Sequence, residues 1–386
     1  MKLLLVVNSS LINSTGGVEH VLCDMANEME KRGFDVHIAT MENKEGKPFF
    51  YLNKNISFKN LYPELSNKNK FIKKLISLFL KIAGKNNYRD FYFKSLVYQK
   101  YIHSIQPDLI IAFSLPTLLE MTYTNKGKCP IILTVHGNPV NDYTDRFWSR
   151  PTYMNKLFRK TYKNADVIQV LLDSYKSFVP KEYKGEVITI GNIAPFVSKE
   201  PLSLDKQKIT SIGRLCLEKH QDLLIKAFAK ISDKFPNWSL DIYGEGYLRE
   251  EYQSLIDKLK MTKKIHLKGT SKKTKEILIN SSLFVLPSHV EGFPLVLAEA
   301  MGVGLPCIGL QDCDGTNEII KHKETGFLVA DDENDLAKAM SLLMYDSKLR
   351  QKYGKNSQHE MLQYSSNIIW DKWEDLIKKT INEKRK

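Results

Sequence analysis

The sequence of 386 residues contains few cysteines and no apolar run long enough to cross a lipid bilayer. Its five cysteines form no CxxC pair and are odd in number. Neither a disulfide framework nor a zinc site is therefore predicted, and reduced thiols in the cytosol are the simple interpretation. The apolar start at residues 1–8 is short and no small-residue cleavage site follows it, which favours a first strand over a signal peptide. A cytoplasmic protein is expected.

Acidic residues are scarce in one stretch of the first half. The whole chain carries a formal net charge of +13, and residues 54–100 hold 11 lysines and arginines against two acidic residues. Such an excess is typical of proteins that meet a polyanionic partner or surface. Nucleic acid is not favoured as that partner, because the stretch is apolar and helical and matches no nucleic-acid-binding module.

Apolar residues recur at helical spacing within the same stretch, between four lysines. This is the composition of an amphipathic helix that lies on an anionic membrane surface, and residues 68–100 are predicted to bind one. A core-facing helix with a basic outer face is the alternative. The lysines that would face the lipid are Lys73, Lys74, Lys81 and Lys85.

Short apolar runs alternate with helical patterns along the chain, which predicts the α/β class with parallel sheets. The predicted strands lie at 2–8, 35–40, 108–113, 130–137, 165–172, 208–215, 238–246, 264–270, 282–288 and 306–310. A helix is expected after most of them, because parallel strands need a crossover connection.

One segment with Pro195, Pro201 and many polar residues interrupts this alternation, which then starts again. Two Rossmann-like domains that face each other across a cleft are therefore expected. The predicted parts are a first domain at 1–190, a linker at 191–207, a second domain at 208–366 and a final helix at 367–386 that packs back on the first domain.

Two cations, Arg214 and Lys219, follow one of the predicted strands and precede a helix. Arginine offers a fork to phosphate oxygens, lysine a point charge, and a helix start adds partial positive charge. The pair is therefore typical of a diphosphate site. A surface loop with two solvated cations is the alternative.

Two glutamates, Glu291 and Glu299, frame the start of a helix eight residues apart. Pro294 fits the first turn, and the backbone N–H groups of Phe293 and Leu295 would then point toward an anion. Glu299 faces an otherwise apolar stripe and needs partners, for which sugar hydroxyls are suitable. Alternatively, Glu299 is a solvated helix residue and Glu291 a cap.

Three further positions lie at the ends of predicted strands. Gly17 in GGVEH and Gly244 in YGEG would allow a ligand to approach the backbone closely, and an ordinary turn explains each equally well. His136 ends a strand in the first half and is followed by Gly137. His136 is either a member of the site or a structural histidine.

Taken together, these segments resemble glycosyltransferase family 4, the retaining enzymes of the GT-B fold. The resemblance runs in order through GGVEH, GRL with its following lysine, GEG, EGFPLVLAEAMGVGLP, GTNEII and GFLV. Its most specific part is a Glu-x7-Glu motif, which here runs from Glu291 to Glu299. The region from 43 to 125 matches nothing in the family's pattern.

The resemblance implies a role for each candidate residue. Arg214 and Lys219 would hold the donor diphosphate, Glu299 would accept the ribose hydroxyls, and the reaction would need neither a metal nor a cofactor. Glu291 would touch the donor sugar, and His136 would line the reaction centre. The remaining implied donor contacts come from Gly17, Gly244, Phe293, Pro294 and Leu295.

The function that this resemblance implies is transfer of a hexose or N-acetylhexosamine, with retention of configuration, from a nucleoside-diphosphate sugar such as a UDP-sugar to a sugar acceptor. The basic stretch favours a lipid-linked acceptor in surface polysaccharide biosynthesis, such as lipopolysaccharide or capsule, and a peripheral place on the inner face of the cell membrane. Two alternatives stay open: a non-catalytic sugar-nucleotide-binding partner in a glycosyltransferase complex, and a soluble transferase acting on a small acceptor.

Overall fold

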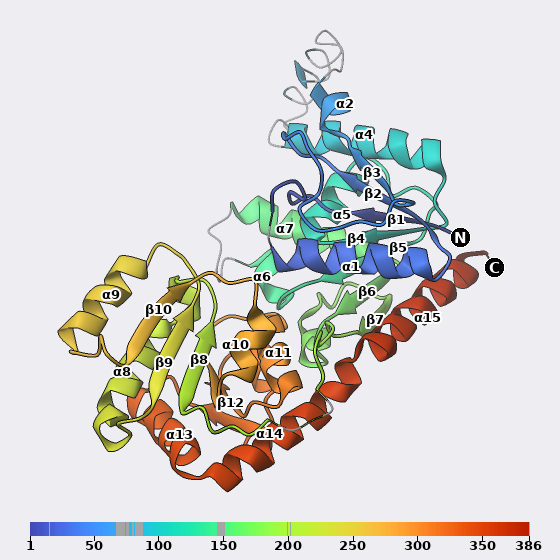
Figure 1. Cartoon of the computed structure of the whole chain (residues 1–386). Helices are drawn as coiled ribbons and strands as arrows, with labels where there is room; N and C mark the ends of the chain where they lie inside the picture. The colour runs from blue at the N-terminus through green and yellow to red at the C-terminus, as the bar shows by residue number, and fades with distance from the viewer. Residues whose placement is uncertain are drawn as a thin grey trace. The chain divides into compact units, whose positions relative to one another are not determined.

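The computed structural model describes the chain except for residues 15, 67–73, 75–76, 79–80, 82–87, 145–150, 199, 201 and 386. The chain forms two compact units, each built around its own sheet (Figure 1). Unit 1 consists of Met1–Ile190 and Trp370–Lys386, and unit 2 of Gly191–Ile369. Every strand pairing in both sheets is parallel, so the predicted α/β class is confirmed.

Seven strands form the sheet in the described part of unit 1, in the order β3-β2-β1-β4-β5-β6-β7. The strands are β1 (Lys2–Val6), β2 (Asp35–Thr40), β3 (Ser57–Asn60), β4 (Leu109–Ala112), β5 (Ile131–Val135), β6 (Val167–Val170) and β7 (Glu186–Thr189). The central strands are buried on both faces, as their continuous apolar runs require; Leu3, Leu4 and Leu5 have no exposed surface. The strand order reverses between β1 and β4, and ligands of open α/β sheets bind beyond such a switch point.

Helices flank this sheet (Figure 1). The α-helices described in unit 1 are α1 (Gly17–Lys31), α2 (Tyr62–Ser66), α4 (Arg89–Ile105), α5 (Leu115–Thr122), α6 (Val140–Tyr143), α7 (Thr152–Thr161) and most of α15 (Ser366–Arg385). Ion pairs hold α15 to the rest of unit 1: Arg32 contacts Glu374 at 2.6 Å, and Lys379 contacts Glu186 of β7 at 2.7 Å. Trp373 is buried on the same helix.

Unit 2 repeats this architecture with six strands among its described residues, in the order β10-β9-β8-β11-β12-β13. The strands are β8 (Lys208–Ile212), β9 (Ser239–Tyr243), β10 (Ile265–Gly269), β11 (Leu283–Leu286), β12 (Cys307–Leu310) and β13 (Gly326–Val329). The α-helices are α8 (Gln221–Ile231), α9 (Arg249–Lys258), α10 (Thr274–Ile279), α11 (Leu295–Val303), α12 (Asp314–Asn317), α13 (Glu333–Tyr345) and α14 (Ser347–Met361). The switch point falls between β8 and β11, so the loops that follow these strands are the natural ligand-binding loops.

The segment 191–207, predicted as a linker, lies within unit 2. The backbone N–H of Ala194 donates to the carbonyl of Tyr364 at 2.9 Å, and the N–H of Ser198 donates to the carbonyl of Gly302 at 2.9 Å. Described parts of this segment are therefore fastened to the body of unit 2.

Part of the predicted membrane-binding stretch lies outside the described residues, including Lys73 and Lys85. Lys74 and Lys81 are described and exposed. The end of the stretch forms α4, which packs against α5 and buries Tyr98 completely. In the part of the chain that the structure describes, no helix is both long and apolar enough to cross a membrane.

Candidate functional site

The loop between β8 and α8 carries the two predicted cations and is shaped by glycines. Gly244 has φ +143°, and a Cβ added there would lie 1.9 Å from the carbonyl oxygen of Gly213, so no other residue fits without moving the backbone. The N–H of Leu215 donates to the carbonyl of Glu245 at 3.0 Å. The loop after β9 therefore holds the loop after β8, and Gly244 has a packing role whether or not a ligand approaches it.

Lys219 and Glu291 meet directly, although they come from different loops. Lys219 Nζ lies 2.5 Å from Glu291 Oε1, and the two side chains are only 19% and 10% exposed. A second link lies beside this ion pair, because the N–H of His289 donates to the carbonyl of Glu218 at 2.9 Å. An ion pair and a backbone hydrogen bond thus join the loops after β8 and β11. Arg214 lies on the same β8 loop, exposed to solvent.

The start of α11 lies four residues after Glu291. Pro294 precedes the helix rather than occupying its first turn, and its carbonyl accepts the N–H of Leu297 at 2.9 Å. Phe293 is buried and packs edge-on against Tyr364, with ring centroids 5.0 Å apart. The first amide groups of a helix such as α11, starting at Leu295, have no acceptor within the helix and suit an anion.

Glu299 lies on α11 among residues that are fully buried, such as Ala298 and Ala300. Burial raises the pKa of Glu299 to about 7, because an apolar environment disfavours the charged carboxylate. Hydrogen bonds donated by a ligand would therefore stabilise the charged form of Glu299.

One supporting contact was not predicted from the sequence. A Cβ added at Gly315 would lie 2.8 Å from the backbone and Cβ of Glu291, so the start of α12, with the loop before it, packs closely on the glutamate. Buried Cys313 lies on the same loop, and burial raises the pKa of its thiol. The DGT sequence at 314–316 was a signal for this close approach, since glycine is often found where two backbones touch.

His136 lies at the end of β5 in unit 1. Thr134 Oγ1 is 2.8 Å from its Nε2, and its ring stacks on Phe113 with centroids 5.6 Å apart. Burial lowers the pKa of His136 to about 4, so the imidazole is neutral at physiological pH. A Cβ added at the next residue, Gly137, would meet nothing within 4 Å, so there is open space at Gly137.

Gly17 is the first residue of α1, after the switch-point strand β1. A Cβ at the neighbouring Gly16 would lie 2.1 Å from Glu19 Oε2, so the carboxylate of the helix itself lies over this position. Glu19 is buried, and an acidic group at a helix N-terminus is electrostatically favourable. The contact with Glu19 thus explains why residue 16 is a glycine, without any ligand.

The predicted site residues divide between the two units. Arg214, Lys219 and Gly244 lie on the loops after β8 and β9, and the segment from Glu291 to Glu299 follows β11. All of these are in unit 2, and direct contact joins Lys219 to Glu291. Gly17 and His136 belong to unit 1.

Two family models match the chain in succession. The model of Glycosyltransferase Family 4 matches residues 15–183, and the model of Glycosyl transferases group 1 matches residues 194–360. Together they support a GT-B glycosyltransferase. The predicted GT-B fold is confirmed, and the site residues named above in unit 2 all fall within the second match.

Known proteins agree with this assignment over nearly the whole chain. An uncharacterized glycosyltransferase of Haemophilus influenzae is 26% identical over 95% of this chain and 97% of its own length. A Campylobacter jejuni protein, named as an alpha-1,4-N-acetyl-D-galactosaminyltransferase that acts on GalNAc-alpha-(1->4)-GalNAc-alpha-(1->3)-diNAcBac-PP-undecaprenol, is 24% identical over 96% of this chain and 97% of its own.

Among solved structures, a point mutant of S. aureus TarM in complex with fondaparinux, alpha-GlcNAc-glycerol and UDP matches with a TM-score of 0.75. The match covers 97% of this chain and 99% of TarM at 16% identity. At this identity the likeness concerns the fold, and it agrees with two α/β units of the glycosyltransferase type.

Proposed function

We propose that this glycosyltransferase moves a hexose or N-acetylhexosamine from a nucleoside-diphosphate sugar, with UDP as the expected nucleotide, to a sugar acceptor with retention of configuration. The observation that carries the proposal is the contact of Lys219 with Glu291 just before α11, the helix that also bears the partly buried Glu299. Such a donor has three parts: a diphosphate, a sugar and a ribose. The cation Lys219 suits the diphosphate, and the carboxylates Glu291 and Glu299 suit the sugar and the ribose.

The diphosphate is assigned to Arg214, Lys219 and the first amides of α11. Breaking the bond between the sugar and the diphosphate develops negative charge on the phosphate, and fixed positive groups stabilise that charge most when they need no rearrangement. Lys219 is held in place by Glu291, so its ammonium group is already positioned. These groups would do the work that a metal ion does in other transferases.

The ribose is assigned to Glu299. Two ribose hydroxyls can donate to one carboxylate, and those bonds favour its charged form over the neutral form. A carboxyl whose pKa lies near 7 in the protein alone gains more from such donors than an exposed one, because water does not already satisfy it.

The sugar is assigned to Glu291, with the neutral His136 of unit 1 at the reaction centre. An imidazole with a pKa of about 4 is not a permanent cation near neutral pH, so His136 is suited to hydrogen bonding with a hydroxyl rather than to holding phosphate. The departing phosphate would accept the proton of the acceptor hydroxyl, and no separate protein base is required.

The acceptor is proposed to be a lipid-linked sugar, with the protein at the inner face of the cell membrane in surface polysaccharide biosynthesis. The name of the Campylobacter jejuni relative describes an acceptor that ends in PP-undecaprenol. The charge excess at residues 54–100 agrees with an anionic membrane surface as the place of work.

The test is to incubate the protein with a panel of nucleotide sugars and to follow slow hydrolysis by release of the nucleoside diphosphate. Hydrolysis of one donor, lost in the Arg214→Ala and Lys219→Ala variants, is the expected result. Lys230→Ala is a matched control, because Lys230 is a lysine of α8 that pairs with Glu333 away from Glu291. Donor binding without hydrolysis or transfer to any acceptor would instead favour the non-catalytic partner.

A further inference from the structure

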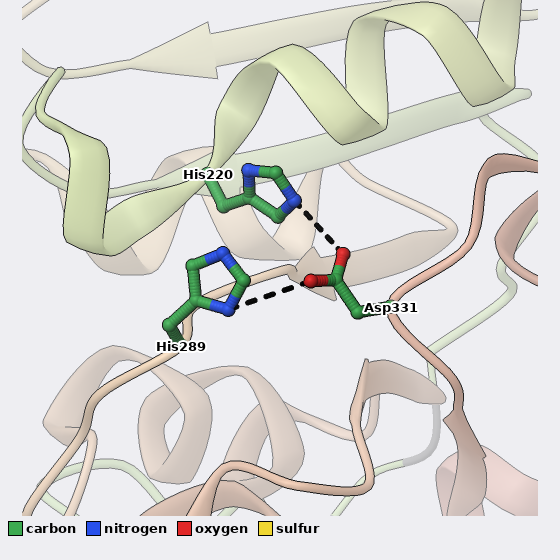
Figure 2. A group of neighbouring side chains, drawn as sticks. All are labelled: His220, His289 and Asp331. Carbon is green, nitrogen blue, oxygen red and sulfur yellow. Dashed lines mark hydrogen bonds and ion pairs between the residues drawn. The ribbon is translucent and has the colours of Figure 1, made fainter.

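Three side chains from separate loops of unit 2 converge beside the β8 and β11 loops (Figure 2). His220 Nε2 lies 2.9 Å from Asp331 Oδ1, and His289 Nδ1 lies 3.8 Å from Asp331 Oδ2. The two imidazole rings lie face to face at a tilt of 31°, with centroids 4.2 Å apart. Each residue offers one ligand atom, and these atoms all lie within 4.8 Å of one another.

The ring of His220 lies between two carboxylates. Its Nδ1 is 3.0 Å from Asp222 Oδ1, and its Nε2 is 2.9 Å from Asp331 Oδ1. A neutral imidazole carries one N–H and satisfies only one of these carboxylates, whereas a protonated ring, or a ring with a cation bound at Nε2, satisfies both. Asp222 would then accept the Nδ1–H, which is the usual partner of a metal-bound histidine.

We propose that His220, His289 and Asp331 bind one divalent transition-metal ion with the ligand preference of zinc. Two imidazoles and one carboxylate are a common zinc ligand set, and they leave a fourth position for water. Ligand atoms on a tetrahedral zinc ion lie about 3.4 Å apart, and the three ligand atoms here lie within 4.8 Å of one another. Mg²⁺ and Ca²⁺ are disfavoured, because they prefer oxygen ligands.

His220 directly precedes the first residue of α8 and has φ 50° and ψ 40°, the left-handed region. Glycine is the usual residue in this conformation, and a histidine there costs about 1 kcal/mol or more. A His220→Gly substitution is therefore compatible with the local backbone.

The bound ion would connect three loops of unit 2. His220 follows Lys219 on the β8 loop, His289 lies two residues before Glu291, and Asp331 follows β13. The ion would thus stiffen the loops that carry Lys219 and Glu291 without contacting either residue. The inference rests on these contacts alone and does not depend on the proposed sugar transfer.

The test uses the full chain, stripped of metal with a chelator and then freed of the chelator. Titration with zinc chloride followed by calorimetry should show one strong site, and zinc should raise the melting temperature by about 5 °C at a hundredfold excess over Kd. His289→Ala and His220→Gly should each weaken zinc binding by about 100-fold or more. His220→Gly suits the backbone at φ 50° and should fold normally.

The matched control is His266→Ala. His266 is another histidine of unit 2 and pairs with Asp241 at 2.9 Å, but it belongs to no such cluster among the described residues. This variant should keep the affinity of the wild type. Equal zinc affinity in the wild type and both cluster variants, or an equal loss in His266→Ala, would mean only adventitious binding and would overturn the proposal.

Discussion

Lys219 Nζ and Glu291 Oε1 form an ion pair at 2.5 Å, between residues 72 positions apart in the sequence. The pair places the proposed diphosphate cation against the proposed sugar-binding carboxylate. Both side chains are largely shielded from water, so their attraction is screened less than that of an exposed ion pair.

Arg214→Ala and Lys219→Ala should each lower turnover by about 100-fold or more while the fold is kept. Loss of one preorganised charge partner costs on the order of 3 kcal/mol of transition-state stabilisation. Steady-state rates of hydrolysis measure the loss of turnover, and circular dichroism spectra check that the fold is kept. Near-normal rates in both variants would remove the diphosphate assignment, provided that Lys230→Ala also behaves as the wild type.

Donor affinity should depend on pH through Glu299. Its pKa is raised to about 7 in the protein alone by burial, and hydroxyl donors bind the charged form. Affinity should be about tenfold weaker at pH 6 than at pH 8, because about a tenth of the free protein then carries the charged carboxylate. An intact nucleotide sugar is the right probe, since its diphosphate does not titrate in this range. Glu299→Gln should bind more weakly at pH 8 and show a flat profile.

The carboxyl group of Glu299 should also make the free energy of unfolding depend on pH. In the unfolded chain Glu299 titrates near its ordinary value of 4.5, and in the folded protein near 7. Between these values the folded state holds the proton longer, so the contribution of Glu299 to the free energy of unfolding falls as pH rises from about 4.5 to 7 and is constant above. Urea denaturation should show Glu299→Gln gaining stability over the wild type across that interval. A constant difference would argue against a buried, titrating carboxyl.

Much of this fold could be predicted from the sequence because central parallel strands are apolar on both faces. The ten predicted runs all contain strands, whereas β3, β7 and β13 were not predicted. Each of these three is an edge strand of its sheet. An edge strand has one neighbour and more contact with solvent, so β3 (SFKN) and β7 (EVIT) carry polar residues that hide the pattern.

The candidate site was predictable only where its residues lie close in the chain. The interval from Glu291 to Glu299 spans one loop and one helix, so the sequence shows both glutamates at once. The pairing of Lys219 with Glu291 and the convergence of His220, His289 and Asp331 join distant loops. No local spacing encodes such contacts, and the expectation of no zinc site, which considered cysteines, did not address them.

Hydrolysis of the donor should survive EDTA. We propose that Arg214, Lys219 and backbone amides stabilise the charge on the leaving diphosphate, and a chelator does not remove these groups. Turnover should stay within about twofold of the untreated protein when measured at a temperature well below unfolding. Abolition by EDTA with rescue by magnesium or manganese would contradict this, whereas a lower melting temperature restored by zinc is what the cluster of His220, His289 and Asp331 predicts.

The chain should bind anionic membranes through residues 68–100. Lysines attract such a surface at roughly 1 kcal/mol each, and the attraction fades with salt over a Debye length of about 10 Å. Apolar side chains then hold the docked segment at roughly 25 cal/mol per Å² buried. Tyr98 of α4 is buried inside unit 1 and is not available to lipid. The contact with the membrane is therefore expected from the part of the stretch before α4.

Flotation with anionic vesicles at low salt checks this expectation, and high salt should weaken the binding. Changing Lys73, Lys74, Lys81 and Lys85 together to Glu should abolish it, while slow hydrolysis of the nucleotide sugar in solution persists.

A charge-matched control changes four lysines of unit 2 that are exposed to solvent, namely Lys263, Lys348, Lys352 and Lys355. If this control loses binding equally, net charge alone is responsible. If the wild type does not float with the vesicles at all, the stretch packs within the protein, and the lipid-linked acceptor loses its support from this sequence.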